Sequence, residues 1–391
     1  MEVGRHPTNS WQHVAIVNIP SCKYQLNPLY ISLTIRNFIF GLHYFTAQGS
    51  QVYCVSLDAS KAFDRVLHSG LFMKLANRGI SLSFIKLLKY WYSHLQCAVL
   101  WKGVLGNIFN IARGVRQGGV LSPFLFAIYM AELIGQLSSG YGLYVGNLFM
   151  GCIMYADDIM LLSCSCYGLQ KLVDICEHYG EKWDIIFNPK KTQCVSFGGK
   201  TPDKCGILLN GSKLEWVAKL TYLGCHFVSS SCKVDFSTNI RKFYGSFNNI
   251  LSVLGKNRHE ISCVHLVKSY CVPSLAYGCE IWNLSCVEYL HMNVLWNNTF
   301  RKIFNCCWRE STKQLLFYCE VVPMSYIIDQ HTILFYKRLQ TSENKVVRVL
   351  ARINRDSVGA ILSKYGFHSL QNSVFDIKEM MWAEFTRNVG L

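Results

Sequence analysis

Two adjacent carboxylates, Asp157 and Asp158, interrupt a segment that otherwise has the composition of a buried strand, "CIMYADDIMLLSC" at residues 152–164. The flanking residues are apolar and β-prone, and an unpaired charge buried between paired strands is costly. One interpretation is an exposed hairpin tip, since Asp is a common turn residue. The other is a pair of metal ligands at a tight turn. Taken alone the segment favours the hairpin tip, so the choice depends on the rest of the chain.

A third aspartate, Asp58, follows an apolar strand predicted over residues 52–57. Two strands of one sheet that each carry a carboxylate near one end can bring oxygens from distant parts of the sequence to one point. Such a site suits Mg²⁺, which prefers oxygen ligands in octahedral geometry and keeps waters for substrate phosphates. A pair of these ions would stabilise both the attacking and the leaving oxygen of a phosphoryl transfer.

A glycine-rich segment, "GVRQGGVLSPFLF" at residues 114–126, strengthens this interpretation. Its glycines let the backbone approach a ligand closely, and Gln117 can both donate and accept hydrogen bonds. A helix is predicted directly after the glycines, so its N-terminal amides face the same place. The arrangement suits a base pair and a sugar-phosphate. A plain strand-to-helix turn would explain the glycines but not Arg116 and Gln117 between them.

Five motifs occur in the order of reverse-transcriptase motifs A to E: "LDASKAFDRV", "GVRQGGVLSPFLF", "YADD", "FNPKKTQCVSFG" and "LTYLG". The sequences of these motifs resemble those of the LINE-type (non-long-terminal-repeat) retrotransposon reverse transcriptases. The segment "PSLAYGCEIWNLS" at residues 273–285 resembles the region after the palm in the same elements. The resemblance implies an RNA-directed DNA polymerase that uses two Mg²⁺ ions, or Mn²⁺ in their place. It also implies an RNA template, a DNA primer and deoxynucleoside triphosphates (dNTPs) as partners.

Carried over by position, the resemblance assigns Asp58 and Asp157 as metal ligands, with Asp158 supporting the site. The backbone carbonyl of Ala59 would join the coordination. Lys191, in "NPKKT", would lie beside the triphosphate and neutralise or protonate the leaving pyrophosphate. From the residues alone, a solvated loop lysine explains Lys191 equally well.

The resemblance also assigns the substrate-binding residues. Phe63 matches the steric gate whose ring occupies the space of a ribose 2′-OH, and a core aromatic side chain is the alternative. The residues that would pack against the incoming nucleotide are Arg116, Gln117 and Gly118. The residues that would form the primer-gripping hairpin are Tyr222, Leu223 and Gly224.

The elements that must position these residues follow from hydrophobic periodicity. Helices are predicted over residues 31–46, 69–92 with a stop at Gly79, and 167–183, with strands between them. Residues 143–164 are predicted to form a hairpin with its tip at Asp157–Asp158, and a second hairpin is predicted with an Asn-Gly turn at 210–211. From about residue 234 to the end the pattern is helical. The predicted fold is therefore α+β: a right-hand polymerase palm, an antiparallel sheet with helices and reduced fingers, followed by an all-helical thumb-like region.

The predicted organisation has three parts. Residues 1–30 are unassigned, residues 31–230 hold a fingers remnant and the palm, and residues 231–391 form the helical thumb and C-terminal region. Only 57 residues precede Asp58, and they contain little of the basic fingers region that the family carries there. We therefore expect a 5′-truncated open reading frame or a piece of a larger polyprotein.

Basic residues outnumber acidic residues by 39 to 24, which gives a formal net charge of +15. The excess is spread over both halves, with 20 basic and 12 acidic residues in 1–230 and 19 and 12 in 231–391. A basic body without a basic tail suits a polyanion such as nucleic acid. The charge alone also fits an ordinary basic protein.

Eighteen cysteines show no regular framework, so we expect reduced, mostly buried thiols and no structural zinc. The longest apolar stretches are too short for a transmembrane helix, and the N-terminal residues lack the apolar core of a signal peptide. We therefore expect no membrane partner and an intracellular location, in the cytoplasm and/or the nucleus.

Three functions stay open at this point. The first is the reverse transcriptase domain, and the second is a decayed or co-opted nucleic-acid-binding protein that keeps the fold. The third is a related palm protein such as an intron maturase. The intact Asp58, Asp157 and Asp158 favour an enzymatic ancestry, and the "YGCEIW" segment argues against a maturase.

Overall fold

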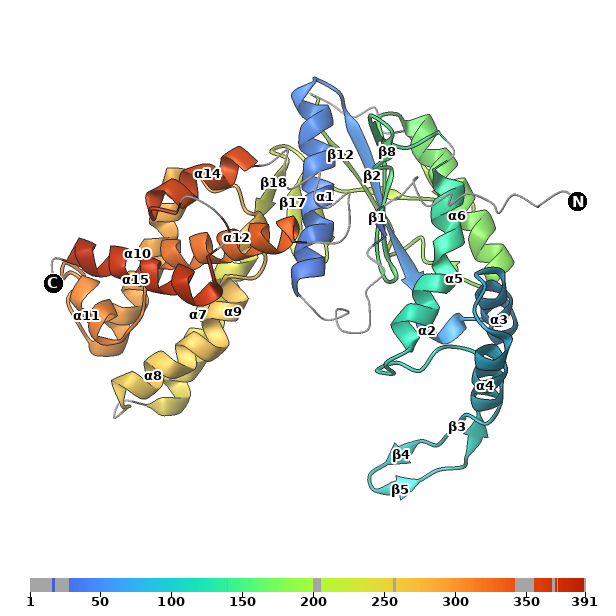
Figure 1. Cartoon of the computed structure of the whole chain (residues 1–391), viewed down its shortest axis with the longest axis horizontal. Helices are drawn as coiled ribbons and strands as arrows, with labels where there is room; N and C mark the ends of the chain where they lie inside the picture. Colours follow the sequence, from blue (N-terminus) through green and yellow to red (C-terminus); the bar gives the residue numbers. More distant parts are fainter. Residues whose placement is uncertain are drawn as a thin grey trace, which may run out of the picture. The chain divides into compact units, whose positions relative to one another are not determined.

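The computed structural model describes residues 16–17, 28–138, 140–199, 205–255, 258–341, 355–367, 370 and 372–389. The chain divides into two compact units, residues 1–232 and residues 233–391. The first unit combines a sheet with helices, and the second is helical from α7 onward (Figure 1). The predicted α+β fold followed by a helical region is confirmed. Of the unassigned segment 1–30, residues 1–15 and 18–27 lie outside the described part.

A seven-stranded sheet forms the centre of the first unit, in the order β1-β9-β10-β2-β12-β15 with β11 paired to β2. Strands β9, β10, β2 and β12 are antiparallel neighbours, whereas β1 and β15 add short parallel pairs at the edges. The strands are β1 (Ile16–Val17), β2 (Val52–Ser60), β9 (Cys152–Tyr155), β10 (Asp158–Ser163), β11 (Ile186–Phe187), β12 (Gln193–Phe197) and β15 (Glu215–Trp216).

The predicted helices of the first unit are confirmed, and the region predicted over residues 69–92 forms two helices. Helix formation stops at Gly79, which has a φ of 73°, and resumes where the Ser81 side chain accepts a hydrogen bond from the Phe84 amide at 3.3 Å. The helices are α1 (Pro28–Ala47), α2 (Ala62–Arg65), α3 (His68–Asn77), α4 (Leu82–Ser93), α5 (Ser122–Leu137) and α6 (Cys166–Trp183).

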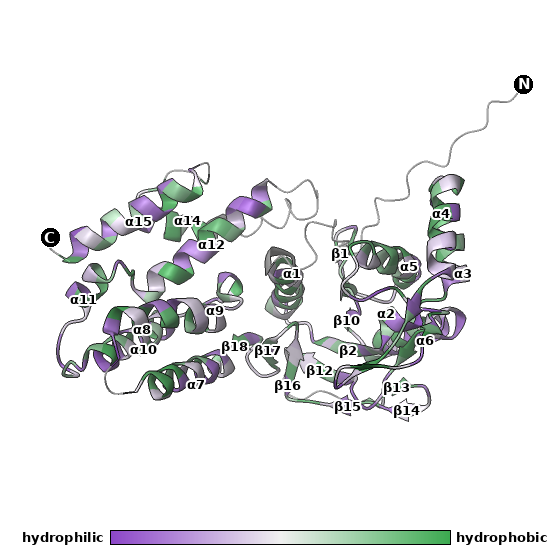
Figure 2. Cartoon of the chain, turned by 90° about the horizontal axis from the view of Figure 1, so that it is seen from below, coloured by the Kyte–Doolittle hydropathy of each residue, from purple (hydrophilic) through white to green (hydrophobic). Residues whose placement is uncertain are grey.

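Alternating residues of β2 face opposite sides of the sheet. Tyr53, Val55, Leu57 and Ala59 pack with buried residues of α3, α5 and α6 in one hydrophobic cluster. Figure 1 shows α5 and α6 on one side of the sheet and α1 on the other. Helix α5 is mostly hydrophobic along its whole length, as its green colour in Figure 2 shows, because the sheet, α3 and α6 cover it.

Helices α3, α5 and α6 meet around Lys74, whose side chain is only 4% exposed. Its ammonium group donates to the Tyr129 carbonyl at 2.7 Å and the Tyr179 hydroxyl at 2.5 Å, and pairs with Glu132 at 3.0 Å. It also lies 3.8 Å from the ring centroid of Trp183. Burial lowers the pKa of Lys74 to about 8, although Glu132 opposes the shift. A buried cation among aromatic rings therefore joins the three helices beneath the sheet.

The remaining strands form small hairpins. The predicted Asn-Gly turn is confirmed, since Asn210 and Gly211 both have a positive φ, as a type I′ turn requires. The single hairpin predicted over residues 143–164 is wrong, because β7–β8 and β9–β10 are separate hairpins. The short strands are β3 (Gln96–Cys97), β4 (Leu100–Trp101), β5 (Val104–Leu105), β6 (Phe109–Asn110), β7 (Tyr144–Val145), β8 (Leu148–Phe149), β13 (Leu208–Leu209), β14 (Ser212–Lys213), β16 (Lys219–Tyr222) and β17 (Cys225–Val228).

The second unit has its own core around the fully buried Trp296. The buried carboxylate of Asp329 accepts from the Tyr289 and Tyr365 hydroxyls and pairs with Lys364 at 2.7 Å, so its charge is compensated. Its elements are β18 (Lys233–Asp235), α7 (Ser237–Leu254), α8 (Glu260–Leu266), η2 (Val267–Cys271), α9 (Val272–Leu275), η3 (Cys279–Ile281), α10 (Cys286–Phe304), α11 (Lys313–Tyr318), α12 (Met324–Gln340), α14 (Arg355–Lys364) and α15 (Val374–Val389).

One disulfide joins Cys166 and Cys205. The expectation of reduced thiols is therefore wrong for this pair, whose separation of 39 residues gave no recognisable spacing. The other cysteines in the described ranges are free, and more than half of them are buried. None of the described helices is long and apolar enough to cross a bilayer.

Substituting Lys74→Met should lower the free energy of unfolding by about 2 kcal/mol, because hydrogen bonds to a charged group contribute about 1.5–3 kcal/mol each when buried. Urea unfolding followed by tryptophan fluorescence measures the change. The control is Lys86→Met on α4, which is exposed and should shift the value by no more than about 0.5 kcal/mol. Equal stability of the Lys74 variant and wild type would show that packing of the lysine stem, and not its charge, holds the helices.

Candidate active site

Asp58 lies inside β2 and not after it, so the predicted strand end at Leu57 is wrong. The strand continues because β11 pairs with its last residues, with Ala59 opposite Phe187. Both backbone polar groups of Asp58 form hydrogen bonds. Its N–H donates to the Thr192 hydroxyl at 3.3 Å, and its carbonyl accepts from the Asn188 N–H at 2.9 Å. The Asp58 side chain is therefore the only part of this residue left to bind a ligand.

The β9–β10 hairpin turns at Ala156 and Asp157, because Tyr155 and Asp158 already pair with each other. The predicted tip at Asp157–Asp158 is therefore wrong by one residue, and Asp158 is the first residue of β10. Ala156 has a φ of 53°, a left-handed conformation that normally favours glycine at the first position of a two-residue turn. Backbone strain of this kind is concentrated at functional sites.

Asp158 pairs directly with Asp58 across the antiparallel β2–β10 ladder. The preceding pair, Leu57 with Ile159, belongs to the core cluster beneath the sheet. Because successive residues of a strand alternate in direction, the two aspartates project from the opposite face. Like charges directly opposite each other destabilise a sheet, so this pairing calls for a compensating positive charge.

The electrostatics of the three carboxylates agree with that requirement. Partial loss of hydration beside the strands, followed by repulsion from Asp157 and Asp58, raises the pKa of Asp158 to about 6. Burial and repulsion from Asp58 also raise the pKa of Asp157. The Oδ2 atom of Asp58 is buried and has no hydrogen-bond partner among the described residues. A divalent cation suits this set, because it would satisfy the oxygen and cancel the repulsion.

Lys191 lies at the edge of this group, in the turn between β11 and β12. Its Nζ atom is 4.0 Å from Oδ2 of Asp58, and its side chain is 67% exposed. The turn is shaped by Asn188, whose side chain accepts from the Lys190 N–H at 3.0 Å and whose carbonyl accepts from the Thr192 N–H at 3.0 Å. The structure therefore brings Lys191 beside Asp58 and leaves its ammonium group accessible.

In the described ranges, one set of three side chains has all its ligand atoms within 4.8 Å of one another, namely Cys279, Glu280 and His331. Cys279 is fully buried, and burial raises the pKa of its thiol well above the ordinary value. This trio belongs to the second unit, in η3 and α12, whereas the three aspartates belong to the first unit.

Phe63 is partly buried and packs against the core cluster. Its ring stacks on Phe126 of α5, with centroids 4.3 Å apart and planes 18° apart. Its carbonyl accepts from the Val115 N–H at 2.8 Å. The ring is therefore a core contact, and the backbone of Phe63 is bonded to the glycine-rich segment. The steric gate stays a prediction.

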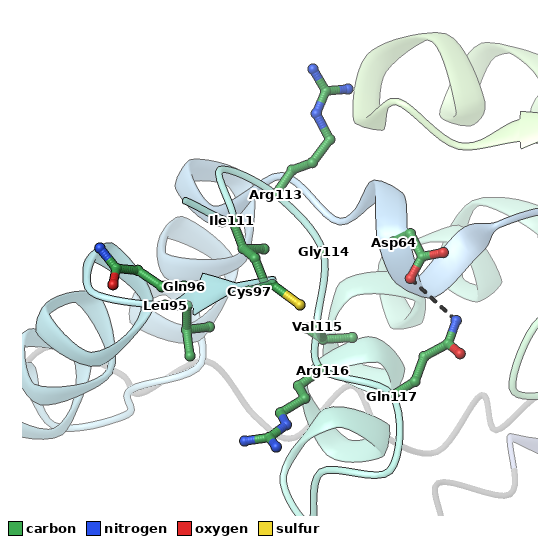
Figure 3. A pocket seen from close by; sticks show the side chains of 10 residues that line it. All are labelled: Asp64, Leu95, Gln96, Cys97, Ile111, Arg113, Gly114, Val115, Arg116 and Gln117. Atoms are coloured by element: carbon green, nitrogen blue, oxygen red, sulfur yellow. Dashed lines mark hydrogen bonds between the residues drawn. The ribbon is translucent and has the colours of Figure 1, made fainter. Parts of the chain in front are cut away.

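The glycine-rich segment passes very close to α2. A Cβ atom on Gly114 would lie 2.8 Å from the Asp64 carbonyl oxygen, and Gly114 has a φ of 90°. Only glycine fits there. The Gln117 side chain donates to the Asp64 carboxylate at 3.2 Å (Figure 3). Gln117 is exposed, as are its neighbours Arg116 and Gly118.

Asp64, Gly114, Arg116 and Gln117 line a pocket of about 520 Å³ that continues toward Leu95 and Cys97. Figure 3 shows the Gln117 amide directed at Asp64, and Arg113 and Arg116 directed away from each other. The structure thus collects Arg116 and Gln117 on one side of the pocket. No contact that it describes joins them to the three aspartates.

Asp184 is a residue that the motif comparison missed. It follows α6 in the left-handed conformation and pairs with Arg65 at 2.5 Å and with Arg113 at 2.8 Å. Arg65 belongs to the first motif, and Arg113 directly precedes the second. The acid thereby fixes the two motifs to each other. No local pattern marks it, since an aspartate after a helix is common.

The predicted primer-gripping residues differ in exposure. Tyr222 is only 2% exposed, and its hydroxyl donates to the Ile153 carbonyl at 3.2 Å. Its ring therefore cannot touch a ligand, and instead it fixes the β16–β17 hairpin to β9. Leu223 and Gly224 form the two-residue turn, both with a positive φ. Of the three predicted residues, Leu223 and Gly224 are accessible to a partner, and Tyr222 is not.

Comparison with known proteins gives consistent relatives. The chain is 28% identical over 307 residues to the RNA-directed DNA polymerase from mobile element jockey of Drosophila funebris, covering 75% of this chain and 33% of that protein. It is 26% identical over 323 residues to the probable RNA-directed DNA polymerase from transposon X-element of Drosophila melanogaster, covering 78% and 34%. The chain thus spans about a third of the length of these curated relatives.

A solved structure of telomerase from Candida tropicalis in complex with a fragment of telomeric RNA aligns with a TM-score of 0.44 and 13% identity, over 90% of this chain and 52% of that one. The resemblance to non-long-terminal-repeat retrotransposon enzymes is confirmed by the curated relatives. The family model "Reverse transcriptase (RNA-dependent DNA polymerase)" matches residues 14–227, which is more than half of the sequence. The chain therefore belongs to the reverse transcriptase family.

Proposed function

We propose that this chain is a polymerase domain that copies an RNA template into DNA by joining dNTPs to a primer end. The observation that carries the proposal is the antiparallel pairing of Asp58 with Asp158 beside the turn at Ala156 and Asp157, in which Ala156 is left-handed. The pairing directs the Asp58 and Asp158 side chains to the same face of the sheet, with Asp157 in the adjoining turn, and Oδ2 of Asp58 is buried without a hydrogen-bond partner among the described residues.

In this proposal Asp58 and Asp157 hold two Mg²⁺ ions, or Mn²⁺ ions, and Asp158 supplies further negative charge. The ions would supply Lewis-acid stabilisation of the attacking and leaving oxygens. Ala59 would contribute its carbonyl oxygen, which needs no ionisable group. The buried sheet on one side of these residues limits access of water and so strengthens the electrostatic interactions.

Lys191 would neutralise the charge that develops on the leaving pyrophosphate. Its exposed ammonium group next to Asp58 supports this role, because it can reach a ligand without leaving its turn. Phe63, with one side packed on Phe126, would present its other edge to the sugar of the nucleotide. A rigid aromatic ring at that place would exclude a 2′-OH by volume.

Arg116 and Gln117 would contact the nucleotide or its template base from the pocket wall, together with the adjacent Gly118. The turn at Leu223 and Gly224 would contact the primer backbone, with Tyr222 holding the hairpin in place. The basic surface of the helical unit, residues 231–391, would follow the phosphates of the product duplex. The alternative is a nucleic-acid-binding protein that has kept this fold without turnover.

Substituting Asp157→Asn should abolish primer extension on a poly(A) template, with a loss of at least about 1,000-fold, because each metal contributes several kcal/mol to the transition state. Template binding in a filter assay should change by less than about twofold, since the basic residues remain. Asp174→Asn on α6 is the matched control and should leave extension unchanged. An inactive wild type that still binds template would favour the binding-protein alternative.

The raised pKa of Asp158 predicts a stability test. The folded state holds this proton more tightly than the unfolded state, so ionisation costs stability as the pH rises from about 4 to about 6. Without divalent ions at pH about 7, Asp158→Asn should therefore be more stable than wild type by roughly 0.5–1 kcal/mol after solvent screening.

Added Mg²⁺ should reverse this order, because only the wild type gains the full stabilisation by the bound ion. The comparison uses chemical unfolding in EDTA and in Mg²⁺. Asp174→Asn, whose carboxylate already pairs with Lys171, is the control and should gain nothing in EDTA. A wild type that is the more stable protein in EDTA would mean that the carboxylates do not repel each other.

Substituting Phe63→Val should raise ribonucleotide incorporation relative to deoxyribonucleotide incorporation and lower the stability by about 1–3 kcal/mol. The matched control is Phe126→Val, which removes the partner of the same ring stack. Its stability should fall similarly, but its sugar preference should stay that of wild type. If both variants keep the sugar preference of wild type, the role of Phe63 is core packing alone.

A further inference from the structure

The segment between the first and second motifs contains no acidic residue. From residue 65 to residue 131 there are eight basic residues and neither Asp nor Glu. Arg65 and Arg113 are paired with Asp184, and Lys74 is buried. In the described part of the chain, the exposed basic side chains of this segment that have no ion-pair partner include Lys86, Lys89, Lys102 and Arg116. Part of the positive charge of the segment is therefore not compensated.

A two-stranded ribbon, residues 96–110, follows α4 and extends away from the sheet (Figure 1). Its strands pair Leu100 with Leu105 and Trp101 with Val104, so apolar side chains occupy both faces. Every residue from 99 to 110 is exposed, and Trp101 has 71% of its surface accessible. Lys102 lies in the turn at the tip, next to that ring. We call this ribbon the arm.

Helix α4 connects the arm to α3 and, like the arm, carries exposed aromatic and basic side chains. Lys86 and Tyr90 are four residues apart and share a helix face, and the Tyr90 side chain is 66% exposed. Trp91 is 47% exposed and lines a hollow of about 380 Å³ together with Arg116. This hollow shares Leu95, Arg116 and Gln117 with the pocket in Figure 3. The aromatic rings and the uncompensated cations thus lead from the arm to the glycine-rich segment.

We propose that α4 and the arm bind a single strand of nucleic acid outside the metal site. Exposed aromatic rings stack on unpaired bases of any sequence, and lysine and arginine contact the phosphates between them. The absence of carboxylates over 67 consecutive residues removes the repulsion that a polyanion would otherwise meet. A duplex would offer its phosphates but would hide its base faces from Tyr90, Trp91 and Trp101.

The proposal deepens the proposed function, because the strand would be the template or the primer strand beyond the duplex. RNA and DNA share the required chemistry, so the test includes both. It uses the full chain carrying Asp157→Asn, without nucleotides, and labelled oligo(U) and oligo(dT) of equal length. Binding is measured by fluorescence anisotropy over a range of salt concentrations. Circular dichroism verifies the folding of each variant.

Trp101→Ser should weaken single-strand binding by about 5- to 100-fold, the loss of one stacked base, and leave the salt dependence unchanged. Lys102→Asn keeps a side chain that tolerates the left-handed turn and should reduce the slope of log affinity against log salt by about 0.7. Matched controls on α6 are Tyr167→Ser and Lys171→Gln, which remove an exposed ring and a lysine and should change neither quantity. The same Trp101→Ser change should leave duplex binding within about twofold, because stacked bases offer no free face.

Tighter binding of oligo(U) would identify RNA as the natural strand, and tighter binding of oligo(dT) would identify DNA, provided that Trp101→Ser weakens it. Unchanged affinity of Trp101→Ser for both oligonucleotides would overturn the proposal. The proposal would also be overturned if Trp101→Ser weakened binding to anionic vesicles but not to oligonucleotides, because the arm would then be a membrane-binding surface. The binding assay needs no catalysis, so the two proposals can fail separately. If the arm binds single strands but the wild type extends no primer, only the proposed polymerase activity is contradicted.

Discussion

The antiparallel pairing of β2 with β10 is the constraint on which the rest of the structure depends. It sets Asp58 opposite Asp158 and, two residues earlier in the ladder, sets Ser56 opposite Met160. The same register assigns every second residue to the core beneath the sheet. The strands that carry the carboxylate pair on one face therefore carry buried apolar side chains on the other. The free energy gained by burying these side chains offsets the repulsion between the two like charges.

The helices beneath the sheet show how that apolar face is kept in position. Lys74 supplies a buried positive charge to three helices, and Asp184 supplies a negative charge to two motif loops. Both residues act through paired or hydrogen-bonded charges, in which loss of one partner is costly. The carboxylates on the open face are thus supported from below by charge pairs that lie outside the aspartate group.

Much of the fold could be read from the sequence. The helices, the Asn-Gly turn and the change to a helical second unit follow from periodicity and turn chemistry, which are local properties. The strand end at Asp58 was misplaced because β11 comes from residues 186–187 and extends β2 by pairing. The hairpin tip was misplaced because Ala156 adopts a conformation that its residue type does not signal.

The candidate site is predicted by motif order, but several contacts around it are not. The Cys166–Cys205 bond, the Asp184 pairs and the burial of Tyr222 all depend on residues distant in sequence. The two-residue turn at Ala156 has a consequence for variation in this chain. Because the turn has no spare residue, a single insertion or deletion there would shift β10 by one position and exchange its two faces. Asp158 would then point into the apolar core and Ile159 toward solvent, so this hairpin can change in composition but not in length.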